Sequence, residues 1–221
     1  MKIAVHQPNF LPYLGFFDKA RQVDTFVILD DVQFTKRGFT NRNKVKKPNG
    51  TIWLTVPLTG DKLQPINQIQ IADHVDWKDS HLKTLKHMYG KADHFQEIFP
   101  KIEEVYDRSW TLLADFNLAL LEVCFASLGI ECTLEFSSTL NITADDGSER
   151  IIKICEKLQA DHYLSGQTGR DYLDLSDYRD HGIELSFHDF DHPVYPQQFG
   201  EFIPNLSVID YLMNVGSKAF W

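Results

Sequence analysis

The sequence predicts an α/β fold, a Rossmann-like parallel sheet interrupted by a β-hairpin and by a helical insertion. Three observations support this prediction. Short apolar segments rich in β-branched residues alternate with segments of helical periodicity near both ends of the chain. A KPNG turn separates two further strand-like segments. From Trp77 to Leu128 the periodicity is helical. We expect a single domain over residues 1–221, with the insertion at 73–128.

The first elements predict a βαβ unit. Residues 2–6 (KIAVH) and 25–29 (TFVIL) have the apolar, β-branched composition of strands in a sheet covered on both faces. Between them, YLGFFDKARQV carries apolar residues at helical spacing, so the two strands should be parallel with a right-handed crossover. Residues 43–47 and 51–57 are the expected hairpin strands.

Helices and strands alternate again after the insertion. Within the insertion, we expect helices over 77–90, 94–107 and 109–129, each ending near a glycine or a polar break. We then expect strands at 131–137, 161–166 and 183–190, and helices at 148–160, 171–180 and 206–216.

Composition narrows the class of protein. The 221 residues are 43% hydrophobic, which is typical of a globular domain, and the net charge of −9 argues against a general nucleic-acid coat or a membrane-surface binder. No apolar run approaches the ~20 residues of a membrane span, and the N-terminus lacks the pattern of a signal peptide. The three cysteines show no CxxC spacing and are expected to be reduced, which predicts a cytoplasmic protein.

Three polar clusters follow predicted strands, where ligands bind in doubly wound sheets. A cleft at this edge would bring the clusters together. The first comprises His6, Gln7 and Asn9, the second Asp30, Asp31, Gln33, Lys36, Arg37, Arg42 and Asn43, and the third Ser165, Gly166, Thr168 and Arg170.

Each cluster also has a structural interpretation. His6 could be a satisfied polar group in a turn, Asp30-Asp31 a helix cap and a solvent-facing acid, and the SGQTGR turn a plain loop. The basic run KRGFTNRNKVKK, in a chain of net charge −9, favours an anionic substrate because local positive charge concentrates phosphate-bearing ligands. The backbone N–H groups of the SGQTGR turn could also face a phosphate.

The segment HDFDHPVY extends the expected cleft through His192 and Tyr195. It holds four side chains able to bind a metal, but alternate residues of an extended segment face opposite ways, so at most a pair converges. We therefore predict no metal site and place a His/Asp pair at the cleft mouth.

The start of the chain resembles nucleotidyltransferases of the HxGH type. These also begin with a strand, a proline-containing turn and an LGH-containing helix start. Here PYLGF (12–16) occupies that place, with Tyr13 and Phe16 where the two histidines would stand. The resemblance implies a nucleotide-binding α/β fold more than it implies nucleotidyl transfer.

A broader resemblance covers residues 3 to about 216. The blocks HQPNFLPYLGFFDKA, FVILDDVQFTKRGFTNRNKVKKPNG, YLSGQTGRDYL, HPVYPQ and LSVIDYLMNVG resemble the WbqC-like family. Members of that family occur in bacterial gene clusters for O-antigen and other surface polysaccharides, and a glycine (aminoacyl) transferase role has been suggested. The resemblance therefore implies polysaccharide (lipopolysaccharide O-antigen) biosynthesis.

Three hypotheses about function follow. In the first, the protein transfers an acyl group such as glycyl onto the amine of a nucleotide-linked amino sugar. In the second, ATP with magnesium activates a carboxylate or phosphate, or is used for nucleotidyl transfer, in the same cleft. In the third, the protein is a non-catalytic partner in the polysaccharide machinery, for which an apolar stripe on 109–128 would have to be exposed.

Under the first hypothesis each cluster has a role. His6 is the general base, since its ordinary pKa of about 6.5 suits proton transfer near neutrality. Asp30 or Asp31 orients the base or the ammonium group, while Gln7, Asn9 and Asn43 donate hydrogen bonds. Lys36, Arg37, Arg42 and Arg170 hold phosphates. The partners are a nucleotide sugar and an aminoacyl donor, which is a free amino acid with ATP, an aminoacyl-tRNA or a thioester. Homo-oligomer formation is left open.

Overall fold

The computed structural model describes residues 1–72 and 75–221. These form two compact units. Unit 1 comprises residues 1–7, 18–31 and 131–191, and unit 2 comprises residues 8–17, 32–130 and 192–221. The predicted start of the insertion at residue 73 lies outside the described residues. That one domain spans residues 1–221 stays a prediction.

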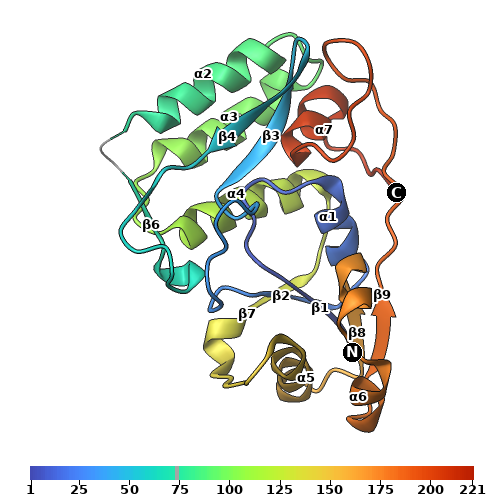
Figure 1. Ribbon diagram of the computed structural model, residues 1–221. Helices are drawn as coiled ribbons and strands as arrows, with labels where there is room; N and C mark the ends of the chain where they lie inside the picture. Colours follow the sequence, from blue (N-terminus) through green and yellow to red (C-terminus); the bar gives the residue numbers. More distant parts are fainter. Residues whose placement is uncertain (73–74) are drawn as a thin grey trace. The chain divides into compact units, whose positions relative to one another are not determined.

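Unit 1 is built on a five-stranded sheet whose strands are all parallel (Figure 1). The strand order is β7-β2-β1-β8-β9, so consecutive strands extend first to one side of β1 and then to the other. This order confirms the predicted α/β, Rossmann-like sheet. The strands are β1 (Lys2–His6), β2 (Thr25–Ile28), β7 (Thr133–Phe136), β8 (His162–Ser165) and β9 (Glu184–Phe187).

Buried apolar side chains at successive positions explain why these strands form a covered sheet, with Ala4, Phe26 and Leu164 on one face. The other face packs against a helix. Ile3 and Val5 of β1, Val27 of β2 and Tyr163 of β8 belong to one buried cluster with Ile154 of the helix α5 (Gly147–Leu158). The Asp146 side chain caps α5 by accepting a hydrogen bond from Glu149 N. The short helix α6 (Leu175–Asp180) precedes β9, and α1 (Leu14–Ala20) lies in the crossover from β1 to β2.

Unit 2 contains the predicted hairpin and helices. Strands β3 (Arg42–Lys47) and β4 (Gly50–Thr55) pair antiparallel, with Lys47 opposite Gly50. Asn49 lies in the intervening turn at a φ of 61°, a conformation that asparagine tolerates. The remaining elements are β5 (Leu58–Thr59), β6 (Gln70–Ile71), α2 (Trp77–Tyr89), α3 (Phe95–Asp107), α4 (Leu113–Leu128) and α7 (Val208–Val215).

The helices of unit 2 pack as a layer beside the hairpin. The helix α3 contacts α4, α2 and α7, and α7 contacts β3 (Figure 1). The apolar stripe of α4 is buried, including Leu120, Leu121 and Phe125. Among the described residues, no helix is long and apolar enough to cross a membrane.

Several predicted strands are shorter than the sequence suggested, such as 183–190, which is β9 alone, and two predicted helices begin four residues late. The helix expected at 109–129 begins only at Leu113, because Ile71 N donates to Thr111 O and Leu113 N donates to Ile69 O. These bonds hold residues 111–113 in an extended conformation beside β6. The helix expected at 171–180 is α6 alone, since Asp174 caps it by accepting from Ser176 N.

A buried polar network joins four segments of unit 2. Asp210 of α7 is fully buried, and its two carboxylate oxygens accept hydrogen bonds from Tyr89 Oη at 2.7 Å and Tyr195 Oη at 3.0 Å. Tyr89 Oη in turn accepts from Lys46 N at 2.9 Å. Burial raises the pKa of the Asp210 carboxyl. The network therefore fixes α2, α7 and the chain around Tyr195 against the hairpin.

Replacing Asp210 with leucine should lower the free energy of unfolding by about 2–4 kcal/mol, because two buried hydroxyl groups lose their acceptor. Tyr195→Phe, which removes a single donor, should cost only about 1 kcal/mol. Urea unfolding followed by circular dichroism measures both changes. Equal stability of Asp210→Leu and the wild type would contradict a structural role for this network.

Candidate functional site

At the carboxyl edge of the sheet in unit 1, the hydrogen-bond ladder between β1 and β8 ends early. Strand order reverses at this point, where open α/β sheets bind their ligands. The ladder between these strands pairs only Lys2 with His162 and Ile3 with Tyr163, whereas the β1–β2 ladder continues to His6 opposite Ile28. The last three residues of β1 are therefore paired on one side only.

The side chain of Lys19 lies beside the part of β1 that has no partner on the β8 side. His6 O accepts a hydrogen bond from Leu29 N after β2, so the carbonyl of Val5 points to the other side, toward β8. Instead of a β8 amide, Lys19 Nζ donates to Val5 O at 3.1 Å. The Lys19 side chain is only 4% exposed, and its Nζ lies 5.7 Å from the centre of the Phe26 ring. A lysine ammonium thus takes the place of a missing ladder bond.

Burial changes the protonation of Lys19. Desolvation lowers the pKa of Lys19 to about 7, because water no longer stabilises the charged ammonium. In the described residues, no carboxylate lies within ion-pair distance of its Nζ. Near neutral pH a substantial fraction of Lys19 is consequently the uncharged amine.

His6 lies beside Lys19 at the end of β1. Its Nδ1 is 3.0 Å from Gln7 O, and since a carbonyl oxygen only accepts, Nδ1 carries the proton and Nε2 is the acceptor nitrogen. The side chain keeps partial exposure, yet desolvation by the surrounding protein and repulsion from the Lys19 charge lower the pKa of His6 to about 3. The ring also stacks on Phe26 with a centroid separation of 6.5 Å. His6 is therefore neutral at physiological pH.

A second His-containing pair lies at the end of β9. His188 Nε2 donates to Asp18 Oδ2 at 2.6 Å, and both side chains are buried. The backbone N–H of His188 donates to Ser165 O, which ties this pair to the end of β8. Asp18 also forms an ion pair with Arg21 at 2.7 Å. The described residues contain no group of three or more His, Cys, Asp or Glu side chains placed to hold a metal ion.

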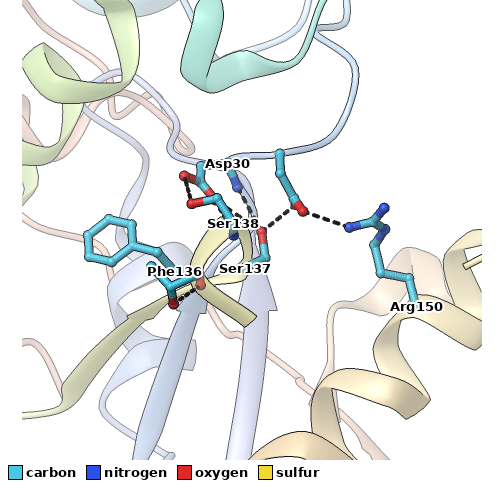
Figure 2. Close-up of polar contacts among 7 residues, drawn as sticks. Asp30, Phe136, Ser137, Ser138 and Arg150 are labelled. Carbon is cyan, nitrogen blue, oxygen red and sulfur yellow. Dashed lines mark hydrogen bonds and ion pairs between the residues drawn. The ribbon is translucent and has the colours of Figure 1, made fainter. Parts of the chain in front are cut away.

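Asp30 and Asp31, predicted as catalytic, are held by hydrogen bonds within unit 1. Asp30 Oδ1 accepts from Ser138 N at 3.0 Å, and Asp30 Oδ2 accepts from Ser138 Oγ at 2.7 Å. Asp31 accepts from Ser137 Oγ and pairs with Arg150 at 2.9 Å (Figure 2). These contacts join the carboxyl ends of β2 and β7. Both carboxylates thus have structural partners in unit 1.

The SGQTGR turn is compact. It forms a short 3-10 helix over Gln167–Asp171, and a Cβ added at Gly169 would lie 2.1 Å from Ser165 Oγ, so a larger residue there would displace the Ser165 side chain. Ser165 is buried, while Thr168 and Arg170 are exposed. The Arg170 guanidinium stacks on Phe187 at 4.6 Å. The predicted role of this turn as a phosphate cradle stays a prediction.

The other predicted site residues belong to unit 2. The Asn43 amide is buried and donates to Leu11 O at 2.7 Å, so it supports the chain rather than a ligand. Tyr195 belongs to the Asp210 network, and His192 stacks on Tyr195 with a centroid separation of 6.1 Å. Gln33 forms an isolated bridge with Pro65. The unit also holds Asn9, Lys36, Arg37 and Arg42.

The structure therefore brings together part of the predicted set. Within unit 1, His6 and Ser165 are the last residues of β1 and β8, and Gln7, Asp30 and Asp31 follow β1 and β2 at the same carboxyl edge of the sheet. A single cleft that also includes the residues of unit 2 stays a prediction.

Sequence reasoning missed Lys19 and Asp18. A signal for Lys19 was available, because it lies three residues after Phe16 and four before Val23, on the apolar side of the helical pattern. A lysine on the apolar side of a helix either extends its ammonium to solvent or is buried with a hydrogen-bond partner, and a buried lysine has a lowered pKa.

Comparison with known proteins gives one family. A model of the family described as the WbqC-like protein family matches residues 7–220. A protein of Mycobacterium tuberculosis, "Uncharacterized protein Rv1507c", is 36% identical over 222 residues, covering 99% of this chain and 95% of that protein. No solved structure matches the chain.

Replacing Lys19 with methionine should stabilise the protein near pH 6. The unfolded state keeps Lys19 protonated up to about pH 10, whereas the folded state releases the proton near pH 7. The unfolded state thus binds more protons between these values, so wild-type stability should rise with pH across this window. We expect Lys19→Met to be more stable than the wild type by about 2–4 kcal/mol at pH 6, and less stable by about 1–3 kcal/mol at pH 10, where Val5 O loses the donor that Lys19 supplies.

Denaturant unfolding at pH 6, 8 and 10 measures this difference. Lys157→Met is the matched control, because Lys157 also lies in the last turn of a helix, α5, but is exposed. It should change stability little at any pH. A Lys19→Met effect that is independent of pH would contradict the buried, titrating lysine.

Proposed function

Because the chain belongs to the WbqC-like protein family, we propose that it acts in bacterial surface-polysaccharide biosynthesis as an acyl transferase. The acyl group, glycyl in the first instance, passes to the amine of a nucleotide-linked amino sugar. The observation that supports this reaction is the His6–Lys19 pair at the strand-order reversal of unit 1. Amide formation needs a proton acceptor beside the attacking amine, and this pair supplies one.

The charge of Lys19 affects the basicity of His6. Desolvation is the main reason why the pKa of His6 is lowered, and repulsion from the Lys19 ammonium lowers it further. While Lys19 is charged, His6 is a very weak base. When Lys19 is the neutral amine, this repulsion disappears and Nε2 of His6 becomes more basic. The active form in this proposal therefore has both groups uncharged.

The reaction then proceeds by addition and elimination. The sugar amine attacks the acyl carbonyl carbon, a C–N bond forms, and His6 Nε2 accepts the proton that the nitrogen loses. The side chain of Gln7 donates a hydrogen bond to the developing oxyanion. The bond to the donor's leaving group breaks, and the leaving group takes the proton back from His6. An amide and the released donor group are the products.

The carboxylates act by positioning. Asp30 and Asp31 hold the ends of β2 and β7 through Ser137, Ser138 and Arg150, so their proposed contribution is the rigidity of the sheet edge. Phosphate binding remains proposed for four cations. These are Lys36, Arg37, Arg42 and Arg170.

A second candidate is activation of a carboxylate by ATP with magnesium. The reversal of strand order beside β1 supports it, because doubly wound sheets of this order bind nucleotides there. Release of pyrophosphate that requires both ATP and an acceptor would distinguish this reaction. The third alternative, a non-catalytic assembly partner, is disfavoured because the apolar stripe of α4 is buried.

The base is tested by His6→Asn. The asparagine amide can still donate to Gln7 O as Nδ1 does, but the acceptor nitrogen Nε2 is removed. We expect transfer to fall by about 10²–10⁴-fold with a nearly unchanged melting temperature. The assay offers nucleotide-linked amino sugars with glycine plus ATP, glycyl-tRNA or a glycyl thioester, and detects the glycylated product by mass spectrometry. A fully active variant would exclude His6 as the base.

The role of Lys19 is tested by the pH profile. In the wild type, the transfer rate should rise with pH through about 7 as Lys19 loses its proton. In Lys19→Met this rise of the transfer rate with pH should be absent, since His6 no longer experiences the positive charge. The Lys157→Met control should keep the wild-type profile. If the rate of Lys19→Met still rises with pH through about 7, the titrating group is not Lys19.

A further inference from the structure

The exposed face of the β3–β4 hairpin combines aromatic rings with cations. Lys44 lies directly opposite Trp53 in the strand register, and Arg42 is its diagonal neighbour. The Arg42 guanidinium lies 4.3 Å and Lys44 Nζ 4.9 Å from the Trp53 ring centre. Phe39 completes the group, with its ring centre 6.1 Å from that of Trp53. We call these four residues the hairpin platform.

The platform is open to solvent although two of its members are large and apolar. Phe39 is 51% and Trp53 38% exposed, whereas Val45 and Leu54 on the opposite face of the hairpin are buried. Hairpins with one buried face normally present polar side chains on the other. Exposed aromatic rings on that face mark a surface suited to binding.

The platform is also held rigidly. The Arg42 guanidinium donates to Arg37 O at 2.7 Å, in a turn where Arg37 has a φ of 66°. The backbone carbonyl of Phe39 accepts from Phe10 N at 3.0 Å. The backbone that carries the exposed rings is thus fixed before any ligand arrives, which lowers the entropy cost of binding.

The positive charges here lack carboxylate partners. Over residues 1–72 and 75–221, the ion pairs of the structure include no cation of the run 36–47. By contrast, helix cations of the same unit do pair, as Lys83 with Asp79 and Lys86 with Glu103. In a chain of net charge −9, a basic group without a carboxylate partner attracts anionic ligands from solution.

We propose that the hairpin platform binds a nucleoside diphosphate, with the base stacked on Phe39 and Trp53 and the phosphates beside Lys44 and the neighbouring cations. Aromatic rings stack on any nucleobase, and lysine and arginine recognise phosphate. A neutral sugar would use the rings but not the cations. This inference rests on the proposed function in one respect, because the acceptor proposed there contains a nucleotide.

Calorimetric titration of the full chain tests the platform without any transfer reaction. The probes are UDP, dTDP, GDP, inorganic pyrophosphate and ribose 5-phosphate. Trp53→Ala should weaken binding of the preferred nucleoside diphosphate about tenfold or more, with little effect on pyrophosphate, which has no base. Lys44→Ala should weaken both. Trp53→Phe retains a ring and should recover most of the affinity.

Two matched controls separate these effects from general changes. Trp221→Ala removes an aromatic side chain that is 50% exposed, and Lys83→Ala removes a cation that is already paired with Asp79. Both should bind as the wild type does. Melting temperatures close to the wild-type value establish that each variant is folded.

Several results would contradict the proposal that the hairpin platform binds a nucleoside diphosphate. One is a wild-type protein that binds none of the nucleoside diphosphates, and another is unchanged binding in both Trp53→Ala and Lys44→Ala. Tight binding of a short single-stranded RNA that depends on Trp53, without nucleoside diphosphate binding, would assign the surface to RNA instead. Because the titration needs no acyl donor, absence of transfer by the wild type would refute the proposed function and leave this test unaffected.

Discussion

The hydrogen-bond ladder between β1 and β8 stops after two residue pairs, and the chemistry available in unit 1 depends on that stop. It leaves the carbonyl of Val5 without a strand partner, and a buried backbone acceptor must be satisfied. Lys19 satisfies it from the last turn of α1 and is thereby buried. Burial in turn lowers the pKa of Lys19 and places a titrating charge beside His6. One missing strand contact thus accounts for two perturbed groups at the edge where doubly wound sheets bind ligands.

Acidic groups at the same edge have the opposite character. Asp30 accepts three hydrogen bonds from Ser137 and Ser138, Asp31 pairs with Arg150, and Asp18 pairs with Arg21 and accepts a hydrogen bond from His188. Each is satisfied within unit 1, so these carboxylates fix strand ends and a helix. A perturbed pKa is typical of functional groups. His6 and Lys19, whose pKa values burial lowers, are therefore the groups to which the proposed reaction is assigned.

Unit 2 shows the same contrast between satisfied and uncompensated charge. Lys46 is buried, and its ammonium donates to Gln197 Oε1 and to backbone carbonyls, while the carboxylate of Asp210 accepts from two tyrosines. Two residues earlier on the same strand, Lys44 is partly exposed above Trp53 and has no ion pair among the described residues. The two lysines lie on the same face of β3, because side chains two positions apart point the same way, and it is the contact with Gln197 and Glu201 that makes Lys46 structural.

The sequence by itself determined the strands, the hairpin, the family and the fact that polar residues follow β1, β2 and β8. Local composition and periodicity carry that information, since they depend on neighbours a few positions apart. The sequence could not assign roles within the polar set. Three predicted site residues have partners within the protein: Asn43 donates to Leu11 O, Asp31 pairs with Arg150, and Tyr195 donates to Asp210. Lys19 is a candidate only because its ammonium is buried against Val5 O. Contacts between distant segments determine which polar side chains form hydrogen bonds inside the protein and which stay available to a ligand. Those contacts exist only in the tertiary structure.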